Sequence, residues 1–425
     1  MRVTVYILHH NQWKYLDQAV QSVFDQTYDN IEIILVDNNS KDADVFLPDF
    51  VGRFKFDKVL HRSDSNLKRA ANEVLAVSTG EYVLRLDADD YFHESAVQIM
   101  VDKAKAKTTD FVSTDYFMVN DVGETIGQFY KNSIIDFAKR PDVPMHGACC
   151  LIRTDFLRAS GGYNVGVLMQ DGYDVWLALS GIARGEHINL PLFSYRRHSK
   201  NISNDSDKLI DARRNILASY CPNLPRYTLS YFTRAPLQVA LVAAKELVCI
   251  IAQTDALSPN EVVVFCRGEH NSVTQVDLPS GQITVVERSD PEALEKNAVT
   301  QCLMDFEATH HTSTPFFACI YQKAALNFPI LAGALRSAVT FEADVVHSVR
   351  RETMNLYYHD GVGLKPLSDN VMFTNERSIV FKRYPVCDVY RSIRLQNGYS
   401  DPKIGHFLLK SDETAVEVNH EWDVA

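Results

Sequence analysis

The sequence predicts an α/β protein in which two α/β domains follow one another, the first built on a doubly wound parallel sheet. Apolar runs typical of strands alternate with amphipathic stretches typical of helices roughly every 25 to 30 residues. The early apolar runs are almost continuous, as in parallel strands that are covered on both faces. Pro222 and Pro225 then mark a boundary, and a new alternating pattern follows them. We therefore predict a first domain at 1–220, a linker at 221–235 and a second domain at 236–425.

The composition is that of a globular protein without general affinity for nucleic acids. The chain has 425 residues, 46% of them hydrophobic and 23% charged, and a net charge of −11. Its eight cysteines are scattered without a CxxC pair, which indicates reduced, buried thiols in the cytosol. The most apolar long run, 235–252, contains Lys245 and Glu246, so it predicts a buried helix and not a membrane span. We expect a cytoplasmic protein, and a position at the inner face of a membrane stays open.

Each element of the first half follows from its local pattern. Short β-prone runs bounded by turn residues predict strands at 3–8, 31–36, 59–61 and 82–86. Helical spacing of apolar residues predicts helices at 14–26, 66–79, 92–107, 154–160 and 175–184. Strands at 111–119 and 125–130 enclose a glycine-bearing turn and form a hairpin, so the sheet is expected to be mixed. A last strand at 188–195 contains Pro191, which predicts an edge position.

The stretch 80–90, GEYVLRLDADD, places three carboxylates at the end of a buried strand. The carboxyl ends of parallel strands are where open α/β sheets bind ligands. Asp87 and Asp89 point the same way in extended backbone, so their charges repel unless a cation lies between them. Oxygen ligands suit Mg²⁺ or Mn²⁺ shared with substrate phosphates. The alternative is that Asp89 or Asp90 only caps the helix at 92–107.

Other polar positions each allow a functional and a structural interpretation. Asp37 ends the second strand, where an acid often bonds a ribose or a base edge, but its surroundings are also good turn chemistry. Asp171 precedes the helix at 175–184 and suits either a general base or a helix cap. The cationic loop 196–201 is suited to closing on phosphates, or it is simply solvated. The sequence has no GxGxxG or GxxxxGK[ST] motif, which disfavours a dinucleotide dehydrogenase and a P-loop kinase.

The motifs, in their order along the chain, resemble those of family 2 glycosyltransferases, which have the GT-A fold. The resemblance covers residues 1–205. It is carried by VYILHHN at 5–11, SVFDQTY at 22–28, EIILVDNNSKD at 32–42, SNLKRAANEVLAVSTGEYVLRLDADD at 65–90, HGACCLIRTDFLRASGGYN at 146–164, QDGYDVWLAL at 170–179 and LPLFSYRRHSKNIS at 190–203. The sequence departs from the family pattern at Leu67, where glycine is usual, at His9-His10, and at Gln170-Asp171, where the family more often has Glu-Asp.

The resemblance implies a metal-dependent inverting glycosyltransferase of the hexosyl- or N-acetylhexosaminyl-transferase type. It implies Mg²⁺ or Mn²⁺ as cofactor, a UDP- or GDP-sugar as donor, and a glycan, lipid-linked or protein acceptor in surface polysaccharide or glycoconjugate synthesis. Metal ligation falls to Asp89 and His198, and proton abstraction from the acceptor falls to Asp171. Arg196 or Arg197 would join His198 in closing over the diphosphate. The residues implied in nucleotide-sugar binding are His9, Asn11, Asp37, Asn66, Lys68, Asp87, His146, Arg197 and His198.

The second half has an alternating pattern of its own. Expected helices occupy 205–220, 236–251, 291–307 and 329–340. Expected strands occupy 261–266, 283–287, 316–321 and 345–349, and a strand that turns into a helix occupies 414–423. This half is therefore again α/β.

Through the order of its segments, the second half resembles acylneuraminate cytidylyltransferases. The matching segments are APLQVALVAAKE, EVVVFCRGE, ADVVHSVRRE and AVEVNHEWDVA. The family's basic phosphate-binding loop is absent, and Cys266-Arg267-Gly268 stands where the family has STD. We expect a nucleotidyltransferase-like domain without cytidylyl transfer that serves as a structural, acceptor-positioning or dimerising module in a homo-oligomer. Two alternatives stay open: a bifunctional enzyme that also activates a sialic-acid-like sugar with CTP, and a non-catalytic scaffold that binds nucleotide sugars.

Overall fold

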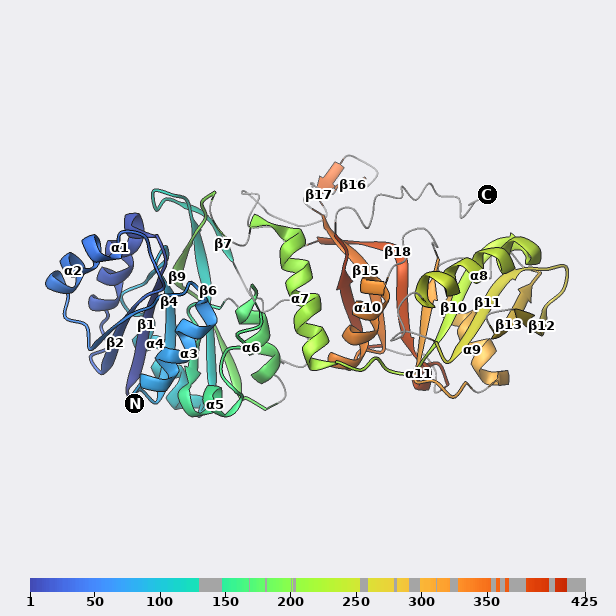
Figure 1. The fold of residues 1–425 in the computed structure, drawn as a ribbon, viewed down its shortest axis with the longest axis horizontal. Helices are drawn as coiled ribbons and strands as arrows, with labels where there is room; N and C mark the ends of the chain where they lie inside the picture. The colour runs from blue at the N-terminus through green and yellow to red at the C-terminus, as the bar shows by residue number, and fades with distance from the viewer. Residues whose placement is uncertain are drawn as a thin grey trace. The chain divides into compact units, whose positions relative to one another are not determined.

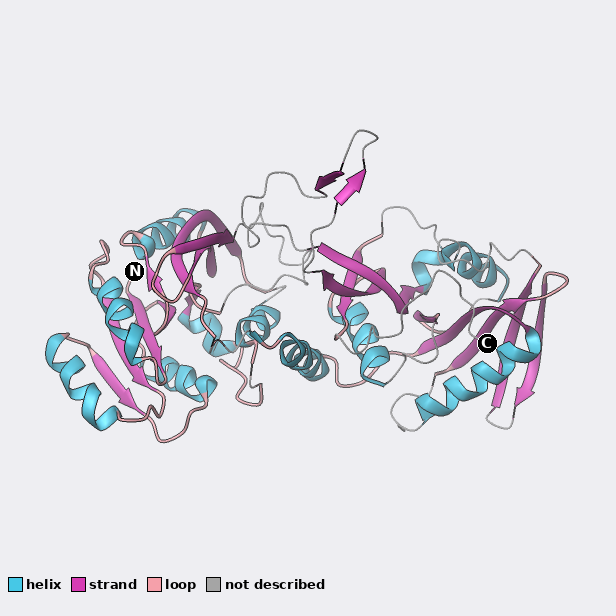
Figure 2. Ribbon diagram, turned by 90° about the horizontal axis from the view of Figure 1, so that it is seen from above, coloured by secondary structure: helices cyan, strands magenta, loops and turns pink. Residues whose placement is uncertain are grey.

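The computed structural model divides the chain into two compact units (Figure 1). The first contains residues 1–205 with 355–378, and the second contains 206–354 with 379–425. Each unit is a sheet with helices packed against it (Figure 2). The residues that the structure describes are 1–129, 147–167, 169–179, 182–199, 201, 204–252, 259–278, 281–289, 299–310, 312–321, 328–352, 357–359, 364–366, 380–396 and 402–410.

The first unit is built on a large mixed sheet. Its strands are β1 (Val3–His9), β2 (Ile31–Asp37), β3 (Lys58–His61), β4 (Tyr82–Asp87), β5 (Tyr91–Phe92), β6 (Phe111–Val119), β7 (Thr125–Phe129), β8 (Leu151–Arg153) and β9 (Gly185–Arg196). Its helices are α1 (Trp13–Phe24), α2 (Ala43–Arg53), α3 (Leu67–Val77), α4 (Ala96–Lys107), α5 (Thr154–Ala159) and α6 (Asp171–Leu179). A two-stranded ribbon, β16 (Tyr357–His359) with β17 (Leu364–Pro366), also belongs to this unit.

The strand order of the first sheet is β3-β2-β1-β4-β8-β6-β9-β5, with β7 paired to β6. β1 to β4 are mutually parallel, as predicted, and the predicted β6–β7 hairpin is confirmed. β8 runs antiparallel to both β4 and β6, which makes the sheet mixed. The carboxyl ends of β1, β2 and β4 meet at one edge, because Leu8 pairs with Asp87 and His9 pairs with Asp37. This edge carries the predicted site.

The helix after the acidic stretch does not begin at 92 as predicted. Tyr91 and Phe92 pair with Ser194 and Phe193 of β9, and α4 begins only at Ala96 with Ser95 as its N-cap. Neither Asp89 nor Asp90 therefore caps this helix. β9 is also not a simple edge strand, because it pairs with β6 on one side and with the short β5 on the other.

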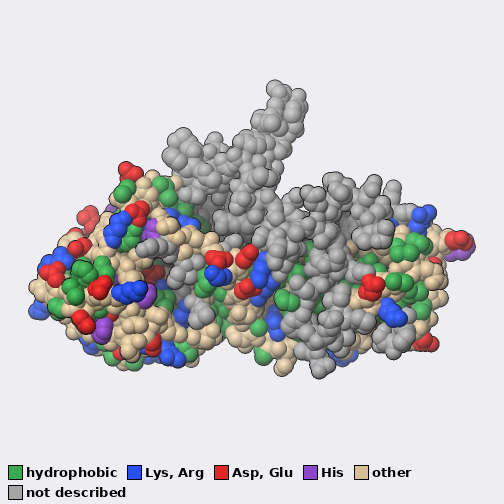
Figure 3. Space-filling view, turned by 45° about the horizontal axis from the view of Figure 1, so that its top comes forward, with side chains coloured by type: hydrophobic (Ala, Val, Ile, Leu, Met, Phe, Trp, Pro, Cys, Tyr) green, Lys and Arg blue, Asp and Glu red, His purple; other side chains and the backbone are tan. Residues whose placement is uncertain are grey.

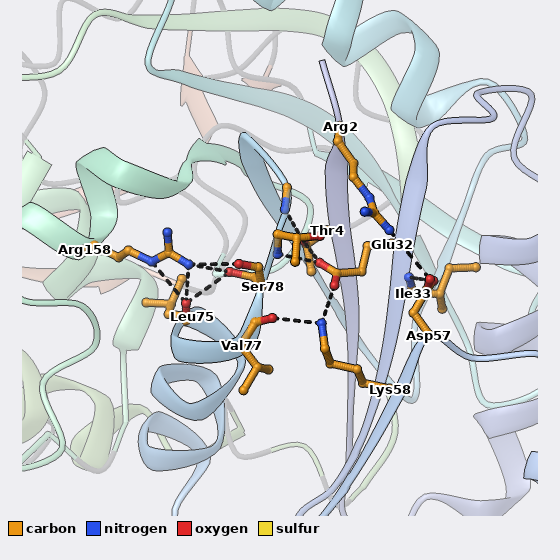
Figure 4. A network of polar contacts seen from close by, with 12 residues as sticks. Arg2, Thr4, Glu32, Ile33, Asp57, Lys58, Leu75, Val77, Ser78 and Arg158 are labelled. Atoms are coloured by element: carbon orange, nitrogen blue, oxygen red, sulfur yellow. Dashed lines mark hydrogen bonds and ion pairs between the residues drawn. The ribbon is translucent and has the colours of Figure 1, made fainter.

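A buried carboxylate ties the strands together at the opposite, amino end of the sheet (Figure 4). Glu32 accepts bonds from Thr4 Oγ1 at 2.5 Å, Lys58 Nζ at 2.5 Å and the backbone nitrogen of Thr79 at 2.7 Å. Burial would raise the pKa of Glu32, but these donors outweigh it and lower the pKa to about 2. The ionised carboxylate thus links β1, β2, β3 and the turn before β4 (Figure 4).

The second unit is also a mixed sheet, in the order β12-β13-β11-β10-β14-β18-β15-β19. Its strands are β10 (Tyr227–Pro236), β11 (Glu261–Arg267), β12 (Ser272–Leu278), β13 (Gly281–Arg288), β14 (Phe316–Ile320), β15 (Val345–Glu352), β18 (Val380–Arg391) and β19 (Ile404–Leu408). Its helices are α7 (Ser206–Tyr220), α8 (Leu237–Ala252), α9 (Val299–His310), α10 (Phe328–Thr340) and α11 (Ser392–Gln396).

The prediction of a linker at 221–235 is wrong. Most of this segment is β10, which pairs in parallel with β11 and β14 in the middle of the second sheet. The division between the units falls earlier, after Asp205, and α7 belongs to the second unit. The two prolines misled the interpretation because they directly precede a buried strand. The strand and helix predicted at 414–423 lie outside the described residues.

The described surface mixes both signs of charge. On the face shown in Figure 3, basic and acidic side chains are interspersed over the coloured residues. Among the described residues, no helix combines the length and the apolar character needed to cross a membrane. The seven cysteines whose side chains are described are all buried, and none of them forms a disulfide with another.

Candidate active site

The acidic stretch forms a tight turn between β4 and β5. The backbone nitrogen of Asp90 donates to the carbonyl oxygen of Asp87 at 3.0 Å, and that of Ala88 donates to Leu8 of β1. Asp87 is half-buried, and its Oδ1 accepts a bond of 2.7 Å from Nε of the buried Arg85. The carboxylate is thus aimed at the edge of the sheet from a fixed strand. Arg85 offsets part of the negative charge gathered here.

Asp89 and His198, the two predicted metal ligands, lie side by side. Asp89 Oδ2 is 3.0 Å from His198 Nε2, and both side chains are largely buried. Burial and the nearby charge of Asp87 raise the pKa of Asp89 above its usual value. The ring of Tyr15 stacks on that of His198, with centroids 5.5 Å apart. The basic loop after β9 therefore reaches the end of β4, as its functional interpretation required.

Arg196 is part of the framework and does not face a diphosphate. Its guanidinium is buried and donates to backbone carbonyls of Asp89, Asn120 and Asp121, and to Gln18 Oε1 of α1. Of the two arginines suggested to close over a diphosphate, Arg196 is thus unsuited to that role. Arg197 remains at the surface side of the loop, and its guanidinium donates to Asn204 at 3.1 Å.

Asp90 holds the loop in place. It is 1% exposed, and its Oδ1 accepts a bond of 2.8 Å from the backbone nitrogen of Arg196. Its Oδ2 is buried and has no hydrogen-bond partner among the described residues. Burial and the charges of Asp89 and Asp87 raise the pKa of Asp90 well above its usual range. The structure thus replaces the predicted helix cap with a clamp between β5 and the end of β9.

A second polar cluster lies where β1 and β2 end. Asp37 is fully buried, and its Oδ2 is 2.9 Å from Nδ1 of His61, the last residue of β3. Its Oδ1 has no partner among the described residues, and neither ring nitrogen of the buried His9 has one. Trp13 packs against the His9 ring, with centroids 4.2 Å apart. Buried polar atoms without partners at the ligand-binding edge of a sheet are suited to hydrogen-bonding a ligand.

The remaining predicted binding residues have structural contacts of their own. Asn11, at a φ of 55°, accepts a bond from the backbone nitrogen of Lys41 and so joins the loops that follow β1 and β2. Asn66 caps α3 by accepting from the backbone nitrogens of Lys68 and Arg69. Lys68 is 3% exposed on the same helix.

Two predicted residues cannot be placed in the site. His146 lies outside the described residues. Asp171 is the first residue of α6, where the backbone of Gln170 has a φ of 61°, but its side chain is outside what the structure describes. The assignment of Asp171 as the base therefore stays a prediction.

The donor atoms present suit a divalent cation that is completed by substrate. Among the described residues, no group of three or more His, Cys, Asp or Glu side chains forms a ready-made metal site. The Asp89 carboxylate and the His198 imidazole are adjacent, and a cation between Asp87 and Asp89 would relieve their repulsion. Mg²⁺ is commonly held by one or two carboxylates plus phosphate oxygens, so this small donor set fits.

Three contributors were missed by the sequence interpretation: Tyr15, His61 and Arg85. Tyr15 packs on His198, His61 pairs with Asp37, and Arg85 pairs with Asp87. Only His61 had a usable signal, because it ends the predicted strand at 59–61 and must therefore lie at the same edge as Asp37.

His9 should make the first unit sensitive to acid. Burial lowers the pKa of His9 to about 4, although Asp37 opposes the shift, and His10 adds to it. Between pH 6.5 and 4 the unfolded chain binds a proton that the folded chain does not, so acidification through this window removes roughly 3 kcal/mol of stability. Chemical denaturation across this range measures the loss. His9→Gln should make the free energy of unfolding less dependent on pH in this range, whereas His10→Gln, at a neighbouring exposed residue, should leave that dependence unchanged. Equal pH dependences in the two variants would contradict the assignment of the effect to His9.

Comparison with known proteins gives matches to the N-terminal part of the chain. Residues 4–160 match the family model described as glycosyl transferase family 2. The glycosyltransferase GlyG of Streptococcus pneumoniae serotype 4 is 32% identical over 130 residues, which are 30% of this chain and 42% of that protein. The hyaluronan synthase of Pasteurella multocida is 24% identical over 234 residues, covering 54% of this chain and 24% of the synthase.

A third relative and one solved structure have a similar extent of overlap. The Escherichia coli protein WfaP, named a UDP-Glc:alpha-D-GlcNAc-diphosphoundecaprenol beta-1,3-glucosyltransferase, is 26% identical over 223 residues, covering 51% of this chain and 86% of WfaP. The structure of S. aureus TarS 1-349 aligns with 51% of this chain and 65% of its own, at 16% identity and a TM-score of 0.42. The chain spans less than half the length of the first curated relatives it matches. Residues 4–160 thus match the family 2 glycosyltransferase model, and they lie in a unit with an α/β fold.

Proposed function

We propose that the first unit transfers a hexosyl or N-acetylhexosaminyl group from a nucleotide diphosphate sugar to an acceptor hydroxyl, with inversion. The observation that carries this proposal is the pairing of Asp89 with His198, at 3.0 Å, next to Asp87. It lies at the same sheet edge as the unpartnered buried atoms of Asp37 and His9. A cation-and-diphosphate position and a nucleoside position are thus adjacent, as a nucleotide diphosphate requires.

Different residues are proposed to contact different parts of the donor. Asp37 and His9 offer an acceptor and a donor to the base, and Asp87 faces the ribose. Asp89 and His198 would hold Mg²⁺ or Mn²⁺, which when bound supplies positive charge to the leaving diphosphate. Asp171 takes the proton from the acceptor hydroxyl as that oxygen bonds to the anomeric carbon and the bond to the diphosphate oxygen breaks. A single displacement of this kind inverts the anomeric centre.

The substrates are part of the proposal. The names of the relatives include a hyaluronan synthase and a UDP-Glc-dependent glucosyltransferase that acts on a diphosphoundecaprenol-linked sugar. They support a UDP-sugar donor, with a GDP-sugar as the alternative, and an acceptor in surface polysaccharide or glycoconjugate synthesis. We place this reaction at the cytoplasmic face of a membrane.

A donor screen tests the activity directly. UDP-, GDP- and CMP-sugars are incubated with the full chain, with Mn²⁺ or with EDTA, and nucleotide release is measured. We expect release from a UDP- or GDP-sugar only with the cation. Absence of release from every donor would overturn the proposal and favour a scaffold that only binds nucleotide sugars.

Asp89→Ala should remove the contribution of the cation to nucleotide binding and leave the contribution of the other residues. In calorimetry with Mn²⁺ present, we expect the affinity for UDP to fall at least roughly 10- to 100-fold. That is the loss typical when a metal site loses an outer-shell partner, and Asp89 is proposed to contact the metal directly. In EDTA the variant and the wild type should bind alike. Asp155→Ala is the matched control, since its carboxylate on α5 is 88% exposed. Equal UDP affinity of the wild type with Mn²⁺ and with EDTA would refute the cation role.

For the second unit we propose a nucleotidyltransferase-like fold without cytidylyl transfer. β11 ends at Arg267 and is followed by Gly268, and the segment leading into β10 has no basic glycine-rich loop. Incubation of the full chain with CTP and sialic or pseudaminic acid should yield no CMP-sugar. Turnover would establish the bifunctional alternative instead.

A further inference from the structure

Seven strands of the second sheet repeat seven strands of the first in order and direction, whereas β5, β7 and β12 have no counterpart. In the first, β3-β2-β1-β4 are parallel and β8 lies antiparallel between β4 and β6, with β9 parallel to β6. In the second, β13-β11-β10-β14 are parallel and β18 lies antiparallel between β14 and β15, with β19 parallel to β15. Identical order and direction allow the two units to be compared position by position.

Side-chain pairs repeat at matching positions of the two sheets. Thr4 of β1 pairs with Glu32 of β2 and bonds it at 2.5 Å. Thr228 of β10 pairs with Glu261 of β11 and bonds it at 3.5 Å. The match fixes β1 on β10 and β2 on β11 as far as Phe232, after which β10 shifts register against β11.

The same correspondence holds on the antiparallel side. The salt bridge between Asp110 and Arg153, 2.7 Å, has a counterpart between Asp344 and Arg391, 3.9 Å. The backbone nitrogen of each arginine donates to the carbonyl of its aspartate, at 2.8 and 2.9 Å. These shared contacts extend the register over the rest of both sheets.

The ion pair beside β3 recurs as well. Arg62 follows β3 and pairs with Glu73 of α3, while Arg288 ends β13 and pairs with Asp305 of α9 at 3.4 Å. The pairing of Asp37 with His61 in the first sheet matches that of Cys266 with Glu287 in the second. We infer that the second unit is a structural repeat of the glycosyltransferase unit.

The repeat shows what has replaced the donor site. Counted along matching strands, Cys266 stands at the place of Asp37, Tyr321 at that of Asp87 and Arg267 at that of Asn38. By residue count along β1 and β10, Arg234 corresponds to His10, and it lies within the register shift between Phe232 and Pro236. The edge that carries Asp37 and Asp87 in the first unit therefore carries Arg267 in the second, with Glu287 at the place of His61, and the counterparts of the cation-binding acids are absent from its described strands.

The arginines gather at one corner of that edge. Arg267 and Arg288 are direct partners on neighbouring strands, which run about 4.8 Å apart. Arg267 is exposed, and no carboxylate of the described residues lies within ion-pair distance of it. Arg234 precedes Pro236, which pairs with Arg267. Among the acids nearby, Asp305 bonds Arg288 and Glu287 accepts from Ser272, so each is engaged.

We propose that the carboxyl edge of β10, β11 and β13 binds a diphosphate directly through Arg234 and Arg267, without a divalent cation. Guanidinium groups bind phosphate oxygens by paired hydrogen bonds, so they take over the neutralising role that a cation has in the first unit. The diphosphate belongs either to a nucleotide or to a lipid-linked acceptor, since both present the same group.

Calorimetry of the full chain in EDTA with inorganic pyrophosphate tests this site. We expect the wild type to bind pyrophosphate and its affinity to fall as salt is added. The affinity should fall about tenfold or more in Arg267→Ala and in Arg234→Ala. Arg267→Lys should recover part of the affinity that Arg267→Ala loses. Arg226→Ala is the matched control, because this exposed arginine precedes the opposite, amino end of β10. Asp89→Ala should bind pyrophosphate like the wild type, which separates this result from the outcome for the first unit.

The outcomes are distinct. No binding in EDTA, equal loss in Arg226→Ala, or loss in Asp89→Ala would overturn the proposal. With binding established, UDP and farnesyl diphosphate are compared with pyrophosphate. Tighter binding of UDP assigns a nucleotide, and tighter binding of farnesyl diphosphate assigns a lipid diphosphate.

Discussion

Replacing Asp171 by asparagine is expected to abolish sugar transfer and to leave donor binding intact. In the proposed reaction this carboxylate has one task, the removal of a proton from the acceptor hydroxyl. A positioned general base contributes roughly 10²- to 10⁴-fold to the rate, and asparagine cannot accept the proton. The substitution keeps the size of the side chain at the first residue of α6. Turnover of the donor identified in the screen is the measurement, together with calorimetry of UDP binding.

The control for Asp171→Asn is Asp155→Asn, which changes another acid in the first turn of a helix, α5. It should keep wild-type turnover. If Asp171→Asn keeps more than a few per cent of the rate, a different acid is the base. If it loses UDP binding as well, the residue has a role in donor binding or in folding, and the division of tasks proposed above is incorrect.

Glu32→Ala is expected to destabilise the first unit by about 3 kcal/mol at neutral pH. Glu32 is 1% exposed, and its carboxylate accepts from three groups, so its removal leaves the Thr79 nitrogen without this acceptor and Lys58 Nζ with only the Val77 carbonyl. Because the folded pKa of about 2 lies below the usual 4.5, this contribution is present above pH 4.5 and is lost as the pH falls towards 2. Urea unfolding followed through the transition of the first unit measures it.

The repeat supplies the matched control. Glu261 occupies the position of Glu32 in the second sheet, but burial raises its pKa, and it has bonds from Thr284 and Thr228 only among its described partners. Glu261→Gln should therefore change the free energy of unfolding little, because the neutral amide replaces a carboxylate whose ionised form is unfavourable at this buried position. Glu32→Gln should lie between the wild type and Glu32→Ala. Equal losses at Glu32 and Glu261 would show that the Lys58 contact is unimportant.

The longer strands of the first sheet could be predicted from the sequence, whereas the short strands β5 and β8 and some helix boundaries could not. The strand over 82–86 is apolar and short, so local pattern was sufficient. The start of α4 at Ala96 depends on Tyr91 and Phe92 pairing with residues a hundred positions later, which no local pattern records. α2 was missed because Pro48 and Gly52 lie inside it.

The chemistry of the site was predictable to the extent that residue type alone decides it. Two carboxylates two residues apart suggested a cation, and the structure brings Asp89 to His198. The same reasoning could not separate Arg196 from Arg197, since adjacent arginines look alike in sequence. Their roles differ because β9 ends between them: Arg196 is turned inward onto the backbone of Asp89, and Arg197 is not.

The turn between β4 and β5 has a consequence for how the site binds its ligand. Both ends of the turn lie in strands of the sheet. The Asp90 carboxylate accepts a bond from the backbone nitrogen of Arg196, and the backbone carbonyl of Asp89 accepts one from the Arg196 side chain. The spacing of the acids is thereby set during folding, before any donor arrives. In the proposed donor complex, the free energy of binding would therefore not include the entropic cost of ordering this loop, and the acidic turn would act as a preorganised receptor.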